Sequence, residues 1–264
     1  MALVETNINE GVMTITLCDE ERRNALSQKL LEELVAAIDL VDGDPDIRVA
    51  VLTNRGKVFC AGADLNERST GPENDDSKSA TQLGTLLQRI RLSPKPFVGR
   101  IAGHCVAGGV GIAAAMDISI AIDTAMFGFT EVRVGVVPAV ISVVCLPKMR
   151  LADAQSAFLR GDRFGSREAA TIGLINMAVT AEELDGEVSA AINDLLEGEP
   201  HAIAVAKQLT SLVPSLSMRE AFESMAVLSS QMFQSPEALE GMTAYLEKRP
   251  ASWVRHVTQN ESSS

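Results

Sequence analysis

The sequence predicts an α/β fold that continues into a helical segment near its C-terminus. Short apolar runs rich in β-branched residues alternate with helical patterns over the first half of the chain, as in an α/β layer. After about residue 150 the apolar spacing becomes helical and stays so. We therefore expect a strand-and-helix core over residues 1–197 and a helical segment over residues 198–264.

Composition narrows the class of protein. The chain has 264 residues, of which 46% are hydrophobic and 22% charged, as is usual for a soluble globular protein with one sizeable core. Its formal net charge is −12 and it has no long basic run, so we expect no nucleic-acid partner. No apolar run is long enough to cross a bilayer and no leader pattern opens the chain, so we expect a cytoplasmic protein without a membrane partner.

The four cysteines do not indicate a metal site. They lack CxxC spacing, which argues against zinc ribbons and disulfide frameworks. We expect them to be small buried apolar residues in a reducing compartment, and we expect no bound metal.

The first half begins with a predicted hairpin. Residues 3–17 alternate apolar and polar side chains around a turn at Asn9-Glu10-Gly11. Ser27 can cap a helix that Gly43 and Pro45 end, and its apolar face is Leu30, Leu31, Leu34, Val35 and Ile38. We expect strands at 48–53, 96–101 and 118–122, and a small-residue helix from Gly108. The polar, acidic segment 67–81 predicts a mobile loop or lid, or else a surface insertion without function.

The second half predicts mainly helices. Apolar spacing places them at 151–159 and 166–172. Thr180 with Glu183, and Ser217 with Glu220, have the spacing of capping boxes. Ser235-Pro236 puts a proline in the first turn of the last long helix.

Two glycine-containing turns could each leave backbone amides free. The stretch Lys57–Leu65 follows a predicted strand, and Gly62 permits a turn that points the amide of Ala63 into a cleft. The stretch Ala102–Gly111 runs through a glycine-rich turn into a helix, whose N-terminus favours the developing negative charge of an enolate or oxyanion. A phosphate loop is the rival interpretation, but neither GxGxxG nor a following Lys-Ser/Thr is present.

These turns and their flanking motifs resemble the enoyl-CoA hydratase/isomerase (crotonase) superfamily over nearly the whole chain. The matching motifs are Arg23-Asn24-Ala25-Leu26-Ser27, Phe59 to Asp64, Ile101 to His104 with Gly108-Gly109, Met116-Asp117-Ile118, Phe127 to Glu131, Gly135 to Pro138 and Glu247 to Pro250. The resemblance implies a crotonase-type spiral of β-β-α units, a C-terminal helical segment that covers the active site and joins subunits, and a homotrimer or dimer of trimers.

The resemblance also assigns residues. It implies that the amides of Ala63 and Gly108 hold the thioester oxygen of an acyl-CoA, and that Glu131 is the general acid/base. Coenzyme A enters as part of the substrate, with no other cofactor. Its pocket would include Arg23, Ala25, Ala61, Asp64 and Leu65. The cations available for its phosphates are Arg22, Arg23, Arg55, Lys57 and Arg68.

One departure from the family pattern bears on the reaction. Hydratases of this family commonly use two glutamates, and Gly111 stands at the position of the first. One glutamate suffices to shuttle a proton between carbons, as an isomerase requires. A substitute could come from Asp117, Asp64 or Glu67, whereas we expect His104 to be packed or hydrogen-bonded.

The stretch after Pro138 departs from the family as well. It reads Ala139-Val140-Ile141 where a glycine-rich form is common. We expect Gly111, Val137, Pro138 and Ile141 to shape an acyl pocket suited to an aliphatic group, although these residues fit a core equally well.

Three functional hypotheses follow from these residues. The first is an enoyl-CoA hydratase-like lyase that works through an enolate held by the two amides. The second is an enoyl-CoA double-bond isomerase that uses the single Glu131. The third is a non-catalytic acyl-CoA-binding protein.

Overall fold

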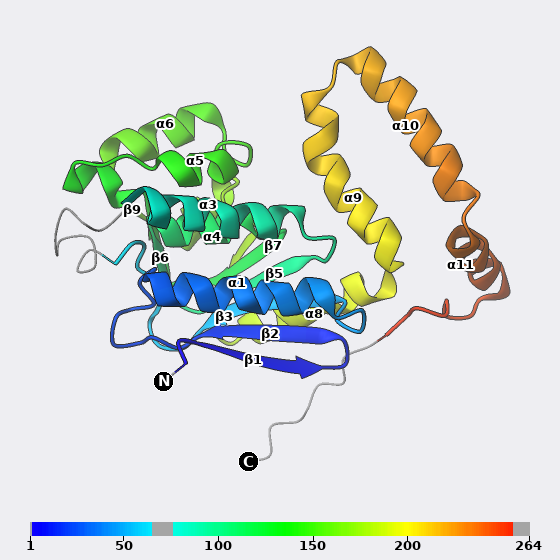
Figure 1. Cartoon of the computed structure of the whole chain (residues 1–264), viewed down its shortest axis with the longest axis horizontal. Coiled ribbons are helices and arrows are strands. Elements are labelled where there is room, and N and C mark those ends of the chain that lie inside the picture. The colour runs from blue at the N-terminus through cyan, green and yellow to red at the C-terminus, as the bar shows by residue number, and fades with distance from the viewer. Residues whose placement is uncertain (1, 65–75, 256–264) are drawn as a thin grey trace.

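A six-stranded sheet forms the base of the core (Figure 1). The computed structural model describes residues 2–64 and 76–255. The strand order is β1-β2-β3-β5-β7-β10, antiparallel between β1 and β2 and parallel elsewhere. The bounds are β1 Val4–Asn9, β2 Val12–Leu17, β3 Val49–Asn54, β5 Phe97–Ile101, β7 Ile118–Ile122 and β10 Met177–Val179.

Four short strands form a second sheet. Its order is β4-β6-β8-β9, with β9 antiparallel. The bounds are β4 Val58–Cys60, β6 His104–Val106, β8 Met126–Gly128 and β9 Arg163–Gly165. Strands β3, β5 and β7 of the larger sheet are each followed in the chain by β4, β6 and β8, and then by a helix. This repetition is the predicted spiral of β-β-α units.

Helices cover both faces of the larger sheet. On one face, α1 (Gln28–Gly43), α3 (Asp76–Leu92) and α4 (Gly108–Ala115) share the main hydrophobic core. On the other face, α8 (Leu184–Glu197) buries four aliphatic side chains against the valines and isoleucine of the strands. Because both faces are covered, the central strands are apolar throughout, as in other buried parallel sheets.

The predicted hairpin and first helix are confirmed. Strands β1 and β2 pair in register from Val4 with Leu17 to Asn9 with Val12. Their turn places Glu10 at φ 49° and Gly11 at φ 83°, the left-handed pair that suits the twist of a two-residue hairpin. Helix α1 begins after Ser27, whose hydroxyl accepts the Leu30 N–H at 3.2 Å.

The predicted loop at 67–81 is wrong for residues 76–81, which lie in α3. Residues 67–75 lie outside the described residues. Apolar residues in the second half of this helix stabilise it, because Leu86, Leu87 and Ile90 are buried on the face that packs on the core. The polar residues at its start hid this spacing.

The predicted capping box at Thr180 is only half formed. Glu183 accepts the Thr180 N–H at 3.0 Å, but α8 starts at Leu184, three residues later than that box requires. A turn occupies residues 181–183 instead. The sequence pattern also gave no sign of the short strands β9 and β10 within the helical half.

The remaining core helices agree with their predicted positions. A 3₁₀ helix, η1 (Thr130–Val134), leads into α5 (Ala139–Cys145). Helices α6 (Leu151–Arg160) and α7 (Ser166–Thr171) follow at the places that the apolar spacing predicts.

A helical arm, residues 199–252, stands away from the core (Figure 1). It comprises α9 (Pro200–Leu212), η2 (Val213–Ser215), α10 (Met218–Phe233) and α11 (Pro236–Glu247). The capping box of Ser217 and Glu220 is present, and Ser235 caps α11. No residue of α9 or α10 is buried. The domain boundary at 197/198 stays a prediction, and none of the helices in the described ranges is long and apolar enough to span a membrane.

Arg48 holds both ends of the arm. Its guanidinium donates to the carbonyl of Gly198 at 2.6 Å and to that of Trp253 at 3.0 Å. The Trp253 indole N–H also donates to the carbonyl of Glu197 at 3.0 Å. Arg48 lies at the start of β3 and is 9% exposed, so one buried cation on the sheet joins the points where the chain leaves and returns.

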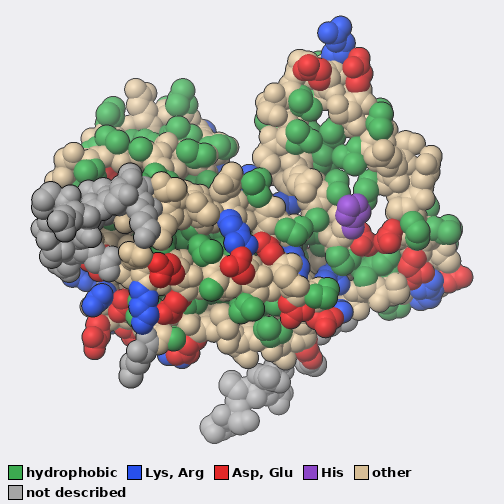
Figure 2. Space-filling view, viewed as in Figure 1, with side chains coloured by type: hydrophobic (Ala, Val, Ile, Leu, Met, Phe, Trp, Pro, Cys, Tyr) green, Lys and Arg blue, Asp and Glu red, His purple; other side chains and the backbone are tan. Residues whose placement is uncertain are grey.

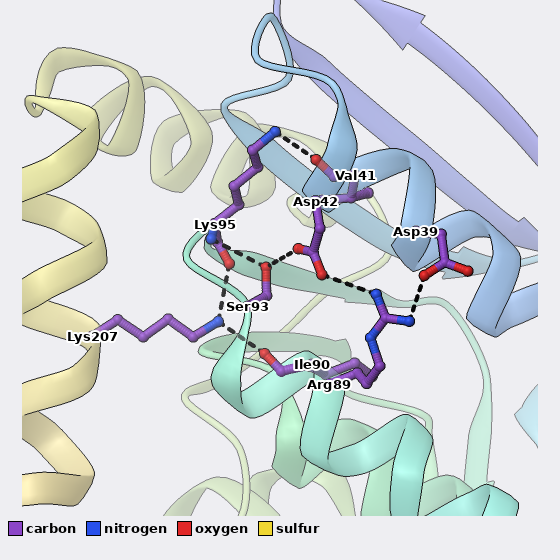
Figure 3. A network of polar contacts seen from close by, with 8 residues as sticks. All are labelled: Asp39, Val41, Asp42, Arg89, Ile90, Ser93, Lys95 and Lys207. Carbon is purple, nitrogen blue, oxygen red and sulfur yellow. Dashed lines mark hydrogen bonds and ion pairs between the residues drawn. The ribbon is translucent and has the colours of Figure 1, made fainter.

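A second attachment ties α9 to the far ends of α1 and α3 (Figure 3). The Lys207 ammonium donates to the carbonyls of Ile90 at 2.9 Å and Lys95 at 3.0 Å, and it pairs with Asp117 at 2.8 Å. Lys95 in turn donates to the carbonyl of Val41 at the end of α1. Burial lowers the pKa of Lys207, while Asp117 opposes that shift. Polar contacts of the Lys207 side chain, which is 8% exposed, therefore supply part of the attachment of α9.

We expect Arg48→Met to destabilise the fold. The change removes two charge-assisted hydrogen bonds and leaves two carbonyls without donors, at a cost of about 2 kcal/mol. For a chain of this size that lowers the Tm by about 4–8 °C in a thermal melt. Arg55→Met is the matched control, because Arg55 forms an exposed ion pair with Glu5. Equal Tm values for the two variants would contradict the role given to Arg48.

Candidate active site

The turn after β4 orients the amide of Ala63. Gly62 adopts φ 82°, and its carbonyl accepts the Leu26 N–H at 2.7 Å. Leu26 and Ala63 form an isolated parallel bridge. Because a peptide group is planar and trans, the N–H of Ala63 points away from the carbonyl of Gly62 and therefore away from Leu26.

The turn after β6 orients the amide of Gly108 in the same way. Ala107 adopts φ 50° and ψ −124°, a conformation that alanine rarely takes and that costs about 1–3 kcal/mol. Its carbonyl points into α4 and accepts the N–H groups of Val110 at 2.9 Å and Gly111 at 3.4 Å. The N–H of Gly108 therefore points out of the helix N-terminus, where the helix dipole favours negative charge.

The two turns touch through their glycines. A Cβ on Gly62 would lie 3.2 Å from the nitrogen of Gly108, and a Cβ on Gly108 would lie 3.7 Å from the Cα of Gly62. Within the described residues, neither the Ala63 amide nor the Gly108 amide donates to a protein acceptor. The structure thus brings together the two amides that the sequence singled out, and their catalytic role stays a prediction.

Glu131 lies on the segment that pairs with the Gly108 turn. The N–H of Ala107 donates to the carbonyl of Gly128 at 2.9 Å, so the chain from Gly128 to Glu131 starts beside the two amides. Glu131 is half-buried, and desolvation raises the pKa of its carboxyl, although its own backbone N–H offsets part of the shift. Its Oε2 is buried without a hydrogen-bond partner among the described residues. A carboxylate in this state is ready to take up a proton.

The four predicted acyl-pocket residues fall into two groups. Gly111, Pro138 and Ile141 are buried, and Ile141 on α5 lies directly against Gly111 on α4. Val137 is 68% exposed on the segment between η1 and α5. Only Val137 is thus open to a ligand in the isolated chain.

The predicted coenzyme A residues lie along the Ala63 turn. The N–H of Ala61 donates to the carbonyl of Arg23 at 3.1 Å, which aligns the segment from Arg23 to Ala25 with the turn. Ala25 is buried, and Asp64 is 6% exposed with its carboxylate 3.9 Å from Arg22. Leu65 lies outside the described residues.

Of the cations considered for the phosphates, Arg55 is held by Glu5 through two hydrogen bonds of 2.8 and 2.5 Å. Arg23 and Lys57 are exposed and form no ion pair with a described residue. Arg68 lies outside the described residues. Arg23 and Lys57 are therefore the available cations near this turn.

The other polar candidates have structural partners. Asp117 accepts the Phe97 N–H at 2.8 Å and pairs with Lys207, so it does not substitute for a second glutamate. His104 accepts the Met126 N–H through Nδ1 at 3.0 Å, which confirms the expectation of a hydrogen-bonded histidine. Glu67 lies outside the described residues.

Two residues that position the site were missed. Asn24 is fully buried at φ 51°, accepts the Asp19 N–H at 2.8 Å and donates to the carbonyl of Val58 at 2.8 Å. It fixes the loop that pairs with Ala61 and Gly62. Its tolerance of the left-handed region was a usable signal. The strained φ of Ala107 had no sequence signal, because alanine disfavours it.

Comparisons with known proteins cover the same span. The family model described as "Enoyl-CoA hydratase/isomerase" matches residues 7–256. A Thermus thermophilus protein is 34% identical over 243 residues, covering 90% of this chain and 96% of its own. The carnitinyl-CoA dehydratase of Proteus mirabilis is 32% identical over 250 residues, covering 92% and 95%.

Solved structures agree with the fold. The crystal structure of an enoyl-CoA hydratase from Mycobacterium smegmatis has a TM-score of 0.90 to this chain at 28% identity, and covers 95% of this chain and 98% of its own. A structure from Legionella pneumophila has a TM-score of 0.90 at 30% identity, covering 96% and 99%. The crotonase-type fold is thereby confirmed.

We expect Gly62→Ala to destabilise the chain more than Gly135→Ala. Both glycines have a positive φ, of 82° and 79°, which costs alanine about 1 kcal/mol. A Cβ at 62 would also crowd Ala107 and Gly108, adding about 1–3 kcal/mol, whereas no atom lies within 4 Å of a Cβ at 135. The free energy of unfolding in urea measures the difference. Equal losses would show that the two turns are not in contact.

Proposed function

The chain belongs to the enoyl-CoA hydratase/isomerase family, and we propose that it hydrates a 2-enoyl-CoA thioester with Glu131 as its proton carrier. It is an enzyme of this family and acts on a coenzyme A thioester. The observation that carries the finer proposal is the pair of free amides on touching turns, together with a half-buried Glu131 whose Oε2 has no hydrogen-bond partner among the described residues. The names of two relatives, a hydratase and a dehydratase, support water addition or its reverse.

The two amides stabilise the charge that develops on the thioester oxygen. Attack of water at Cβ moves electrons onto that oxygen and forms an enolate. The N–H groups of Ala63 and Gly108 donate to the oxygen, with the N-terminus of α4 behind one of them. Both amides are already oriented by their own peptide carbonyls, so little reorganisation opposes the step.

Glu131 moves the proton. As a carboxylate it removes a proton from the water that attacks Cβ, and as a carboxylic acid it returns a proton to Cα. Atoms balance, because the hydroxyl goes to Cβ and one proton goes to Cα. Desolvation, which raises the pKa of Glu131, helps it to hold the proton between the two events.

A double-bond isomerase is the second candidate. The observation that favours it is Gly111, which leaves Glu131 without a second glutamate at the position matching the family's first. In that reaction Glu131 removes a proton from one carbon of a 3-enoyl-CoA and returns it two carbons away. No water is needed, so one carboxylate is sufficient.

The substrate enters without another cofactor in this proposal. Arg23 and Lys57 contact the phosphates of coenzyme A, and backbone near Ala25, Ala61, Asp64 and Leu65 lines its pocket. Val137 and its exposed neighbours Val134 and Val136 support an aliphatic acyl group, because they offer apolar and uncharged surface.

We also propose a homotrimer or dimer of trimers, joined in part by the arm. Figure 2 shows apolar side chains gathered along it. Phe222 and Phe233 are 73% and 69% exposed, and Tyr245 and Leu246 are 83% and 79% exposed. Exposed apolar surface of this extent marks a protein interface.

Purified protein incubated with a 2-enoyl-CoA and, separately, with a 3-enoyl-CoA tests the function. Loss of the conjugated-thioester absorbance with the first supports hydration, and gain of it with the second supports isomerisation. If the absorbance changes with neither substrate but the protein still binds the thioester, the result supports the hypothesis of a non-catalytic acyl-CoA-binding protein.

Glu131→Gln should lower kcat/KM by about 10²- to 10⁴-fold while thioester binding persists. In the native enzyme the base must be ionised, so kcat/KM should rise with pH as Glu131 loses its proton and level off above its raised pKa. Initial rates from about pH 4 to 9 check this, because the range extends well above the usual pKa of a carboxyl group. Activity that survives Glu131→Gln contradicts the assignment.

Light scattering after gel filtration tests the assembly. We expect a mass about three or six times the 28.1 kDa of one chain. The double variant Phe222→Glu/Phe233→Glu should shift the mass toward one chain, because it buries charges in the interface. Glu223→Gln on the same helix is the control. A native protein that is monomeric at all concentrations would contradict the proposal.

A further inference from the structure

Position 111 has no room for a side chain. A Cβ on Gly111 would lie 2.9 Å from the Cβ of Ile141, nearer still to its Cγ2, and 3.4 Å from Cδ1 of Leu87. Non-bonded carbon atoms do not approach to 2.9 Å without a shift of one of them. Gly111 is fully buried in α4, so the added atom could not turn toward solvent.

The atom in the way belongs to a stiff and buried neighbour. Ile141 is 2% exposed, and its branching at Cβ restricts its χ1 rotamers. The clash includes its Cβ, which no rotation of the side chain moves. Only a shift of α5 against α4 would relieve the contact, and close packing opposes that.

The charge of Glu131 acts on the same face of α5. Ile141 and Cys145 are four residues apart and therefore share one face of the helix. Burial raises the pKa of the Cys145 thiol to about 12, and the charge of Glu131 adds to that shift. The face of α5 that fills the space beside Gly111 therefore includes a thiol that is within reach of the charge of Glu131.

We propose that Ile141 is a specificity-determining residue that limits this site to one carboxylate by occupying the volume that a side chain at position 111 needs. The inference deepens the proposed function and rests on it for its catalytic consequence. The two departures from the family pattern, Gly111 and the apolar Ala139-Val140-Ile141, are one exchange: a side chain on α4 has been replaced by a side chain on α5.

The exchange changes the surroundings of Glu131. A second carboxylate would repel its charge and share its proton, whereas Ile141 does neither. Among the described residues, Oε2 of Glu131 is accordingly buried without a hydrogen-bond partner. Of the two family positions, the exchange leaves only Glu131 to take up and to return the proton.

A double-mutant cycle tests the steric part without any assay of activity. Gly111→Ala should lower the Tm by about 5 °C, because the methyl group overpacks the α4–α5 contact. In an Ile141→Gly background, which removes the clashing Cβ as well, the same substitution should have almost no effect on the Tm. Equal effects in both backgrounds would overturn the proposal.

Gly84→Ala is the matched control for the cycle. Gly84 lies on α3 and also faces α5, but its Cβ would meet Val140 Cγ1 at 3.8 Å, an ordinary contact. We expect its Tm to stay the same or rise, since alanine favours the helix. A loss equal to that of Gly111→Ala would show that α5 tolerates no addition anywhere, and would remove the special role of Ile141.

Exchanging the pair tests the catalytic part. In the Glu131→Gln background, Gly111→Glu/Ile141→Gly should regain at least about tenfold in kcat/KM with a 2-enoyl-CoA, because the new carboxylate can reach the reacting water. Gly111→Glu with Ile141 kept should regain nothing. With Glu131 present, the exchanged pair should change the pH profile from one ionisation to two.

The outcomes separate the two proposals. A folded exchange variant without regained activity, or equal activity with and without Ile141, overturns the inference. A native enzyme that turns over no enoyl-CoA refutes the proposed function, while the Tm cycle still decides the steric claim. If the exchange variant fails to fold, the alanine cycle decides the inference.

Discussion

The contact between Gly62 and Gly108 is the constraint on which the rest of the site depends. Strands β4 and β6 are neighbours in the smaller sheet, so the turns that follow them lie side by side. A Cβ on either glycine would meet atoms of the opposite turn or of Leu26 at less than van der Waals distance. The two turns can approach each other this closely only because Gly62 and Gly108 have no side chains.

Holding those amides in place uses the surrounding core. Ala107 keeps a positive φ because its N–H and carbonyl are both engaged, one by β8 and the other by the first turn of α4. Because Gly109 has no side chain, that turn packs directly against Cys60 of β4. Cys60, Cys105 and Val110 are fully buried. The local strain at Ala107 is therefore offset by regular structure on three sides, which preorganises the two donors.

The sequence predicted the features that depend on residues close together in the chain, and it did not predict contacts between residues far apart in the chain. The two turns, the Ser27 cap and the Ser217 capping box each have a local signal. The start of α3 was hidden by polar residues, although the spacing of Leu86, Leu87 and Ile90 was available. Gly111 and Ile141, which touch between α4 and α5, are 30 residues apart in the chain. The two carbonyls that Arg48 binds are 150 and 205 residues away from it in the chain. No local pattern encodes such pairs.

In the proposed mechanism, the burial of Glu131 lets a single carboxylate serve either candidate reaction. A carboxylate in water releases its proton too readily to return it to carbon, whereas desolvation stabilises the protonated form. In the same proposal, an enolate held by the two amides is less basic than a free one, so the proton affinities of the enolate and of Glu131 move toward each other. Transfer between groups of similar affinity has a low barrier in both directions. In this proposal Ile141 excludes a side chain at position 111, and burial raises the pKa of Glu131 so that it can act as both acid and base.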